Sequence, residues 1–390
     1  MVCQTEGKGG ELRAYLALED GVWFEGEGFG APAERGGEVV FNTSMTGYQE
    51  IFTDPSYAGQ MVCLTSAQIG NYGANAWDDE AERPHIEGLI VREFSELASN
   101  WRSQEDCGRY LARHGIPGIA EIDTRALVRH LRDQGAQRGI LAVSGTALDP
   151  EKLTARARAL PVMLGLDLAR NVTTAKAYDW QTRPAPDQYE PAAEALEHPF
   201  RVMAYDFGIK RNILRQLAAH GCQVRVVPAQ TSAEEILAWK PDGLFLSNGP
   251  GDPEPLAYAQ QNLRAMLGRL PIFGICLGHQ LLGLALGGRT YKLKFGHHGG
   301  NHPVRQSATG QIEITAHNHN FAVDPDSLPA AEVELTHFDL NDGTLEGLRH
   351  RSWPLFSVQY HPEAAPGPHD SHYLFSDFVQ LMRDWRTAHP

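Results

Sequence analysis

The second half of the chain alternates short apolar segments with amphipathic ones, and this alternation limits the fold more than any other feature. The apolar runs predict strands at residues 201–207, 223–227, 243–247 and 271–275. The segments between and after them predict helices at residues 209–220, 232–240, 257–267 and 277–286, the second opening on a Ser232/Glu235 capping box. Such alternation is typical of a mainly parallel sheet covered by helices on both faces. In these sheets, ligands bind beyond the carboxyl ends of the strands.

The first half predicts a mixed α/β region and not a regular βαβ series. Residues 12–18 alternate in polarity, as in a strand. Asp20-Gly21 supplies a hairpin turn, and residues 22–24 belong to the second strand of the hairpin. Further strands are predicted at residues 38–42, 61–65, 88–94 and 140–144. A helix is predicted from an N-cap at Asp123 to Gly135. Prolines and lost periodicity indicate a connecting segment at 161–199, so we expect domains at 1–160 and 200–390.

Composition excludes several classes of protein. The formal charge of −14 argues against a nucleic-acid surface, which needs clustered Lys and Arg. No apolar run approaches the ~20 residues of a membrane span, and no secretory signal opens the chain, so we expect a cytoplasmic protein. The five cysteines are scattered and form no CxxC pair, which gives neither a disulfide framework nor a zinc knuckle.

Cys276 lies in the sequence Gly274-Ile275-Cys276-Leu277-Gly278, between a predicted strand and a predicted helix. This is the spacing of a nucleophile elbow, in which paired glycines permit a tight turn around a strained central residue. A helix N-terminus favours the thiolate, and the N–H of Leu277 is placed to stabilise an oxyanion. The alternative is a small buried hydrophobic residue, and we prefer that interpretation for Cys3, Cys63, Cys107 and Cys222.

His361 directly follows an apolar strand predicted at 355–360, with Glu363 two residues later. A thiolate nucleophile needs a base that also protonates the leaving group. Positions i and i+2 of an extended segment point the same way, so Glu363 can orient the His361 ring. Without the elbow, a structural histidine would be the better interpretation among the 17 histidines of the chain.

Three stretches together resemble the class I (triad) glutamine amidotransferases: SNGPGDP at 247–253, GICLGHQLL at 274–282 and HPEA at 361–364. The resemblance implies a flavodoxin-like domain in which Cys276 attacks the carboxamide of L-glutamine, His361 transfers the proton and Glu363 orients His361. It also implies that Gly249 and Leu277 supply N–H groups, while Gly251 and Gln280 hold the amino-acid end. Taken alone, residues 248–253 would read as an ordinary Pro/Gly turn.

Further stretches resemble the small subunit of carbamoyl-phosphate synthetase, at residues 41–57, 121–136, 204–215 and 294–304. The resemblance covers nearly the whole chain beyond the first dozen residues, which we interpret as a disordered tail. It implies that Ser56, otherwise a turn serine, reaches into the glutamine site. The family's NHGFAV stretch appears here as Asn318-His319-Asn320-Phe321-Ala322-Val323. We expect Asn318, Asn320 and Phe321 to contact glutamine, Asn320 in place of a glycine because asparagine tolerates positive φ.

The family makes carbamoyl phosphate from bicarbonate with ATP, yet this sequence contains no P-loop and no dinucleotide-binding fingerprint. We therefore expect no cofactor in this chain, and ATP with Mg²⁺ on a large subunit. The two subunits would form a heterodimer or a higher oligomer of heterodimers. The product would feed arginine biosynthesis, pyrimidine biosynthesis or both.

Five histidines lie close together in the sequence, and histidine is a common metal ligand. They occupy a Gly-rich region without cysteine or carboxylate neighbours, so we expect no metal at His297, His298, His302, His317 and His319.

Three alternatives stay open at this point: an amidotransferase of anthranilate or guanylate synthesis, a free γ-glutamyl hydrolase, and a non-catalytic regulatory subunit on the same fold. The N-terminal 160 residues oppose the first two, and the presence of all three triad residues opposes the third.

Overall fold

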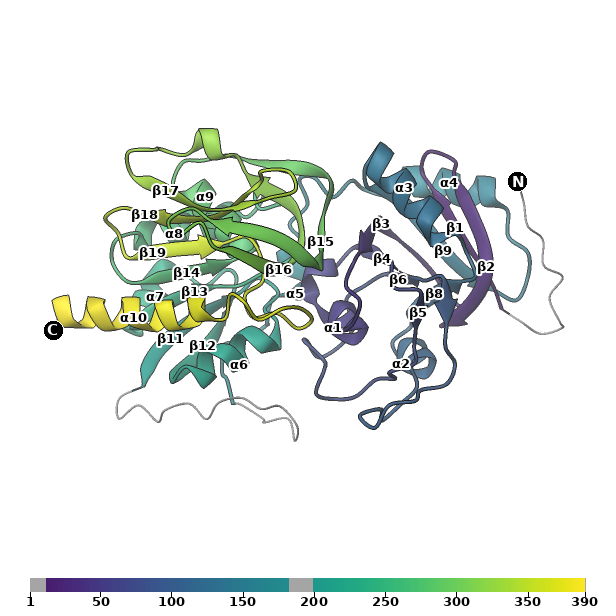
Figure 1. The fold of residues 1–390 in the computed structure, drawn as a ribbon, viewed down its shortest axis with the longest axis horizontal. Helices are drawn as coiled ribbons and strands as arrows, with labels where there is room; N and C mark the ends of the chain where they lie inside the picture. Colours follow the sequence, from purple (N-terminus) through teal and green to yellow (C-terminus); the bar gives the residue numbers. More distant parts are fainter. Residues whose placement is uncertain (1–11, 182–198, 390) are drawn as a thin grey trace. The chain divides into compact units, whose positions relative to one another are not determined.

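The computed structural model describes residues 12–181 and 199–389, which divide into two compact units (Figure 1). Unit 1 comprises residues 12–52, 59–78 and 83–162, and unit 2 comprises residues 53–58, 79–82 and 163–389. Two short segments from the first half of the sequence thus belong to unit 2. Residues 1–11 of the predicted N-terminal tail and residues 182–198 of the predicted connecting segment lie outside the described residues.

Unit 1 is a closed β-barrel with the strand order β1-β2-β8-β6-β4-β3-β9. Its strands are β1 (Arg13–Leu18), β2 (Trp23–Gly30), β3 (Glu34–Asn42), β4 (Gln60–Leu64), β6 (Gly88–Ile90), β8 (Pro117–Ala120) and β9 (Gln137–Ser144). The barrel is filled by buried side chains that include Leu16, Val39, Met61 and Leu141. The predicted hairpin β1–β2 and the strands at 38–42, 61–65 and 140–144 are confirmed.

The predicted strand at 88–94 is instead two strands, β6 and β7 (Glu93–Phe94), and β7 pairs with β5 (Gln68–Ile69) outside the barrel. The helices in this part of the chain are α1 (Tyr48–Thr53), α2 (Cys107–Arg113), α3 (Thr124–Gln134) and α4 (Pro150–Ala159). Helix α3 begins as predicted, because the Asp123 side chain accepts a hydrogen bond from the N–H of Ala126. It ends at Gly135, whose φ of 98° favours glycine.

Unit 2 is built on a ten-stranded sheet with the order β10-β12-β11-β13-β14-β19-β18-β17-β15-β16. Its strands are β10 (Tyr178–Asp179), β11 (Phe200–Asp206), β12 (Cys222–Pro228), β13 (Gly243–Leu246), β14 (Ile272–Ile275), β15 (Thr290–Gln306), β16 (Ile312–Val323), β17 (Val333–Asp339), β18 (Leu345–His350) and β19 (Leu355–Val358). Strands β12, β11, β13, β14 and β19 are parallel neighbours. The predicted α/β fold class is confirmed.

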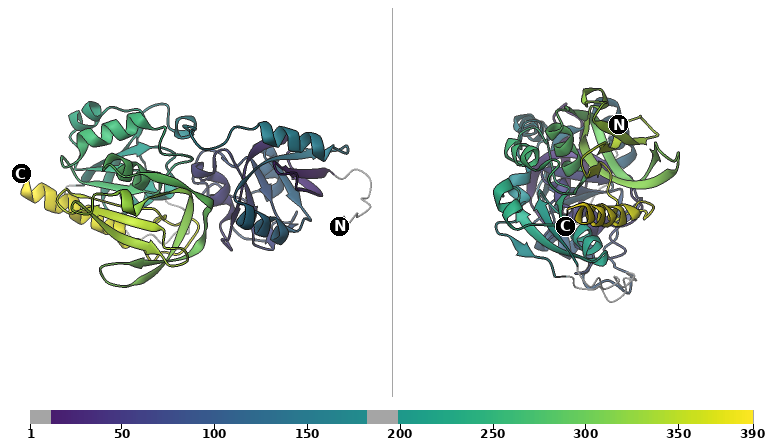
Figure 2. Two further views of the ribbon diagram at one scale, coloured as in Figure 1. Left: turned by 90° about the horizontal axis from the view of Figure 1, so that it is seen from above. Right: turned by 90° about the vertical axis from the view of Figure 1, so that its left-hand side faces the viewer.

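The other half of this sheet, β19 to β16, is antiparallel, and of its strands only β19 was predicted. Helices cover the parallel half on both faces (Figures 1 and 2). One apolar cluster contains buried residues of α7 (Ala233–Ala238), α8 (Ala257–Met266) and α9 (Leu277–Ala285). A second cluster contains those of α6 (Arg211–Ala219) and α10 (Tyr373–Ala388). The short helix α5 (Ala169–Val172) and the 3₁₀ turns η1 (Pro55–Tyr57) and η2 (Pro325–Ser327) complete this unit.

The capping box predicted at the start of α7 is present, with Ser232 and Glu235 each accepting a backbone N–H of the other. Strands β13 and β14 are buried along their whole length, as expected for strands covered on both faces. Across the described residues, no helix has the length and apolar character needed to cross a membrane.

Candidate active site

The carboxyl ends of three neighbouring parallel strands bring the predicted residues together in unit 2. Strand β14 lies between β13 and β19, with Leu246 opposite Gly274 and Ile275 opposite Val358. Strand β13 leads into the loop 247–253, β14 leads into Cys276, and β19 leads toward His361. This is the edge of the sheet at which α/β proteins bind ligands.

Cys276 has the geometry of a nucleophile elbow. It joins β14 directly to α9 with φ 53° and ψ −105°, a conformation that costs energy for a residue with a Cβ. The thiol is 2% exposed, and Sγ lies 3.6 Å from the carbonyl oxygen of Asn318. Because Leu277 is the first residue of α9, its N–H lacks an intrahelical partner and is free to face an anionic oxygen.

The glycines on both sides of Cys276 are required by close packing. A Cβ on Gly278 would lie 2.4 Å from the carbonyl oxygen of Leu246, and one on Gly274 would lie 2.9 Å from the Gly278 carbonyl group. Gly249 is equally constrained, because its Cβ would lie 2.7 Å from the side chain of Leu277. The backbone of Gly249 therefore packs closely against the side chain of Leu277.

Gly278→Ala is expected to lower the free energy of unfolding by about 3 kcal/mol, because the new methyl group meets backbone that cannot yield. Urea denaturation followed by circular dichroism measures this change. Gly145→Ala is the matched control: Gly145 is exposed, and a Cβ there meets nothing within 4 Å. Equal, small effects of the two substitutions would contradict the packing described for the elbow.

His361 and Glu363 form the predicted pair. His361 Nδ1 lies 2.7 Å from Glu363 Oε1, and both side chains are buried. No hydrogen-bond partner within the described part of the chain is found for His361 Nε2, the nitrogen opposite the Glu363 contact. Burial lowers the pKa of His361, but the Glu363 carboxylate and the side chain of Cys276 outweigh burial and raise this pKa to about 10. His361 is therefore suited to hold a proton beside a thiolate.

Lys210 is the functional-site residue that sequence reasoning missed. Its ammonium group is 4% exposed and lies 2.9 Å from Glu363 Oε1. Burial raises the pKa of Glu363, but Lys210 and His361 together lower it to about 2. Burial lowers the pKa of Lys210, and the carboxylates of Glu363, Glu80 and Asp54 raise it above its usual value. Lys210 thus keeps Glu363 ionised, and a lysine directly after the stretch 207–209 was the available signal.

Ser56 lies in the site through a network of polar side chains within unit 2. Asn248 Nδ2 donates to Ser56 Oγ at 2.9 Å and approaches Asp54 Oδ1 at 3.3 Å. Asn318 Nδ2 donates to Asp54 Oδ2 at 2.8 Å. Asp54 also accepts the N–H of Ser56 and so fixes the turn η1. This network joins Ser56 to the loop after β13 and to the strand beside the Cys276 thiol.

Gln280 and Phe321 are in direct contact. Gln280, on α9, donates from Nε2 to the carbonyl oxygen of Phe321 at 2.8 Å and to Gln359 Oε1 at 3.1 Å. Gly251 has φ 83° and packs against Leu168. The structure therefore ties Gln280 to β16, while Gly251 lies in the loop after β13.

Asn320 lies in strand β16 and is absent from the described non-glycine residues that have a positive φ. This position therefore does not use a positive φ, and it lies where the register of β15 and β16 shifts, between the pairs Lys292–Phe321 and His297–His319. The expected contact of Asn320 with glutamine stays a prediction. The Asn320 side chain approaches His298 Nε2 at 3.2 Å and Met163 Sδ at 3.7 Å. His298 in turn bonds Asn318 Oδ1 through Nδ1 at 2.9 Å.

The other described cysteines are buried, and none lies in an elbow like that of Cys276. Burial raises the pKa of Cys63 and of Cys222 to about 12 and raises that of Cys107 as well. These thiols therefore stay protonated at neutral pH. Cys3 lies outside the described residues.

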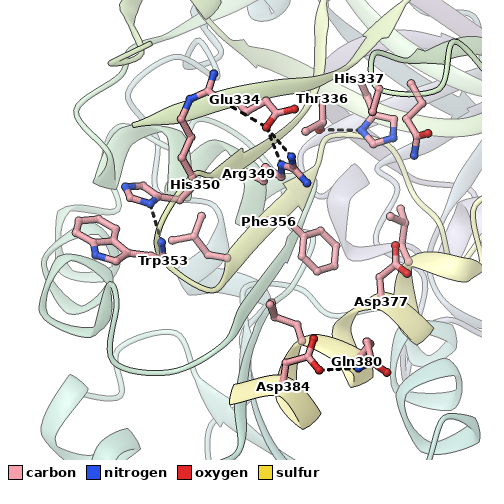
Figure 3. A pocket seen from close by; sticks show the side chains of 16 residues that line it. Glu334, Thr336, His337, Arg349, His350, Trp353, Phe356, Asp377, Gln380 and Asp384 are labelled. Carbon is pink, nitrogen blue, oxygen red and sulfur yellow. Dashed lines mark hydrogen bonds and ion pairs between the residues drawn. The ribbon is translucent and has the colours of Figure 1, made fainter. Parts of the chain in front are cut away.

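A pocket of about 630 Å³ lies elsewhere in unit 2, between β17, β18 and α10 (Figure 3). On one side of it, Glu334 bonds Arg349 at 2.8 Å and lies 3.7 Å from Arg351. His350 stacks on Trp353 with ring centroids 4.0 Å apart. No residue predicted for catalysis or glutamine binding is among the described residues that line this pocket.

Comparisons with known proteins agree with both units. Residues 203–381 match the family model "Glutamine amidotransferase class-I", and residues 16–141 match "Carbamoyl-phosphate synthase small chain, CPSase domain". Proteins named carbamoyl phosphate synthase small chain are similar over nearly their full length. The one from Syntrophotalea carbinolica is 58% identical over 97% of this chain and 100% of that protein. The one from Thermosynechococcus vestitus is 52% identical over 97% of this chain and 98% of that protein. The one from Escherichia coli is 52% identical over 96% of this chain and 98% of that protein.

The match of residues 16–141 decides between the enzyme classes that the sequence left open, because it is specific to one synthase. The relatives support an amidotransferase subunit of a ligase. The chain belongs to the carbamoyl phosphate synthase small chain family.

Proposed function

We propose that this chain hydrolyses L-glutamine to glutamate and ammonia through a thioester on Cys276. The observation that carries the proposal is the elbow conformation of Cys276 beside the His361–Glu363 pair. Lys210 belongs to the same arrangement, because its charge keeps Glu363 ionised.

In the first half-reaction, the Cys276 thiolate attacks the carboxamide carbon and forms the C–S bond. The N–H groups of Leu277 and Gly249 stabilise the oxygen that becomes negative. His361 gives its proton to the amide nitrogen, the C–N bond breaks, and ammonia leaves.

In the second half-reaction, neutral His361 takes a proton from water, which attacks the thioester carbon. The C–S bond then breaks, glutamate leaves and the thiolate returns. Glu363 holds the imidazole in place through both steps and stabilises its protonated form.

The amino-acid end of glutamine is proposed to contact residues from three segments of unit 2. Ser56 and Asn318 share the Asp54 network, Gly251 follows β13, and Gln280 with Phe321 lies between α9 and β16. Asn320 is proposed to contribute through its backbone, since its side chain is engaged with His298.

Ammonia made at Cys276 is proposed to pass to a large subunit that binds ATP and Mg²⁺ and forms carbamoyl phosphate from bicarbonate. Support comes from the family, whose members carry the name small chain, and from a sequence without a P-loop. The product would serve arginine biosynthesis, pyrimidine biosynthesis or both.

The test combines the purified chain with a carbamoyl phosphate synthase large chain. Glutamate release is expected to be slow for the chain alone and to rise on addition of the large chain, ATP and bicarbonate, with carbamoyl phosphate formed in equal amount. Glutamate release that ignores the large chain would retain the glutaminase and reject this acceptor. No release in a folded complex would favour a regulatory subunit.

A further inference from the structure

Three histidines and one glutamate form a buried cluster on the antiparallel half of the unit 2 sheet. His297 lies on β15, His317 and His319 on β16, and Glu346 on β18. Their side chains are at most 8% exposed. One ligand atom from each residue lies within 4.8 Å of the others. His297 is paired directly with His319 across the two strands, so both rings share one face of the hairpin.

Each ring has an inner nitrogen, which approaches Glu346, and an outer nitrogen, which does not. In two of the rings the outer nitrogen faces a hydrogen-bond acceptor that has no proton to give. His297 Nε2 lies 2.8 Å from Asp342 Oδ2, and His319 Nδ1 lies 2.9 Å from the carbonyl oxygen of Phe321. Both outer nitrogens must therefore carry the N–H. In a neutral ring, the inner nitrogens, His297 Nδ1 and His319 Nε2, then carry lone pairs.

The third ring has the same arrangement through Thr315. The Thr315 hydroxyl donates its proton to the carbonyl oxygen of His302 at 3.0 Å, so it accepts from His317 Nε2 at 2.7 Å. His317 Nδ1 is thereby left with a lone pair. It lies 3.1 Å from His319 Nε2, so two lone pairs face each other unless a cation lies between them.

Glu346 supplies a negative charge at the same point. Its side chain is 0% exposed, and neither carboxylate oxygen has a hydrogen-bond partner among the described residues. The oxygens lie 3.7 Å from His297 Nδ1, 3.7 Å from His317 Nδ1 and 3.9 Å from His319 Nε2. These separations are too long for hydrogen bonds but near the roughly 3.4 Å between two ligands of a tetrahedral metal ion.

We propose that His297, His317, His319 and Glu346 bind one Zn²⁺ ion in a closed, structural site. Three imidazole nitrogens and one carboxylate oxygen are ligands that zinc accepts, and four protein ligands are typical of a structural site. The partners of the outer nitrogens, Asp342 among them, are those that orient histidine ligands of metals. The sequence argument against a metal rested on missing carboxylates, and the fold brings Glu346 from β18.

The proposed ion would also fix the strand that lines the active site. Side chains alternate along β16, so His317 and His319 face the ion while Asn318 and Asn320 face the other way. The carbonyl oxygen of Asn318 lies 3.6 Å from Cys276 Sγ. The carbonyl oxygen of Phe321 accepts hydrogen bonds from both His319 and Gln280. Zinc would thus hold β16 in register beside the thiol.

The test measures zinc in the untagged full chain after incubation with Zn²⁺ and gel filtration, by mass spectrometry of the element. About one ion per chain is expected for the wild type and less than about a tenth for Glu346→Gln and for His317→Gln. His302→Gln tests the ligand set, because His302 belongs to an overlapping group, His297, His302, His317 and Asp339, whose ligand atoms also lie within 4.8 Å of one another. It is expected to retain one zinc ion.

Two further readouts are made on the wild type, and the second compares it with Glu346→Gln. Co²⁺ in place of Zn²⁺ is expected to give the intense visible absorption of a tetrahedral site, and chelation is expected to lower the Tm of the wild type but not of Glu346→Gln. A folded wild type that retains no zinc and gives no such spectrum would overturn the proposal. Zinc lost from His302→Gln but kept by Glu346→Gln would overturn the ligand set.

Discussion

Cys276→Ser is expected to lower kcat for glutamine hydrolysis by about 10⁴-fold or more, since removal of a nucleophile disables the whole triad. Serine is similar in size, and it lacks the acidity that lets a thiol ionise beside His361. Glutamate release by the purified chain, with and without a large chain, measures the loss. The fold is expected to be unchanged.

Cys222→Ser is the matched control for that experiment. Cys222 is 7% exposed, lies at the start of β12 and has a thiol pKa raised to about 12 by burial. Its replacement is expected to leave kcat within about twofold, because it touches no member of the triad. Substantial hydrolysis by the Cys276 variant would mean that another group attacks glutamine.

Lys210→Met is expected to lower the free energy of unfolding by about 3–5 kcal/mol, because it removes the ammonium group that pairs with the buried carboxylate of Glu363. The two side chains of this pair are 4% and 0% exposed, so solvent cannot replace the lost charge. Urea denaturation measures the change. Glutamine turnover is expected to fall as well, since an ionised Glu363 is what raises the pKa of His361.

Two comparisons make the Lys210 result specific. The double variant Lys210→Met/Glu363→Gln is expected to recover part of the stability and none of the activity. Arg349→Met breaks a pair with Glu334 that is 58% and 27% exposed, and it is expected to cost less than about 1 kcal/mol. A Lys210 variant as stable as the Arg349 variant would show that the buried pair contributes little.

Local sequence predicted the part of the fold whose strands are apolar and short. Strands β11, β13 and β14 are buried runs separated by amphipathic segments, and this pattern needs no knowledge of the tertiary structure. Strand β8, Pro117–Ala120, was missed because its proline and glycine suggest a turn. Strand β15 was missed because its Gly- and His-rich sequence becomes a strand only through long pairing with β16.

The candidate site was predictable where its chemistry is local in sequence. Cys276 with its glycines occupies five consecutive residues, and His361 is two positions from Glu363. Lys210 and Asp54 were not predicted, because their partners Glu363 and Asn318 lie far along the chain. Glu346 was missed for the same reason: only the strand order places β18 near the histidines of β15 and β16.

The central claim is that Cys276 forms a covalent intermediate with glutamine. Wild-type chain and large subunit would be mixed with glutamine, ATP and bicarbonate, quenched with acid during steady turnover, and digested for peptide mass spectrometry. The account predicts one γ-glutamyl group on the peptide that contains Cys276, absent from the Cys276→Ser variant. Steady glutamate release with no adduct on that peptide, or with the adduct on another residue, would contradict it.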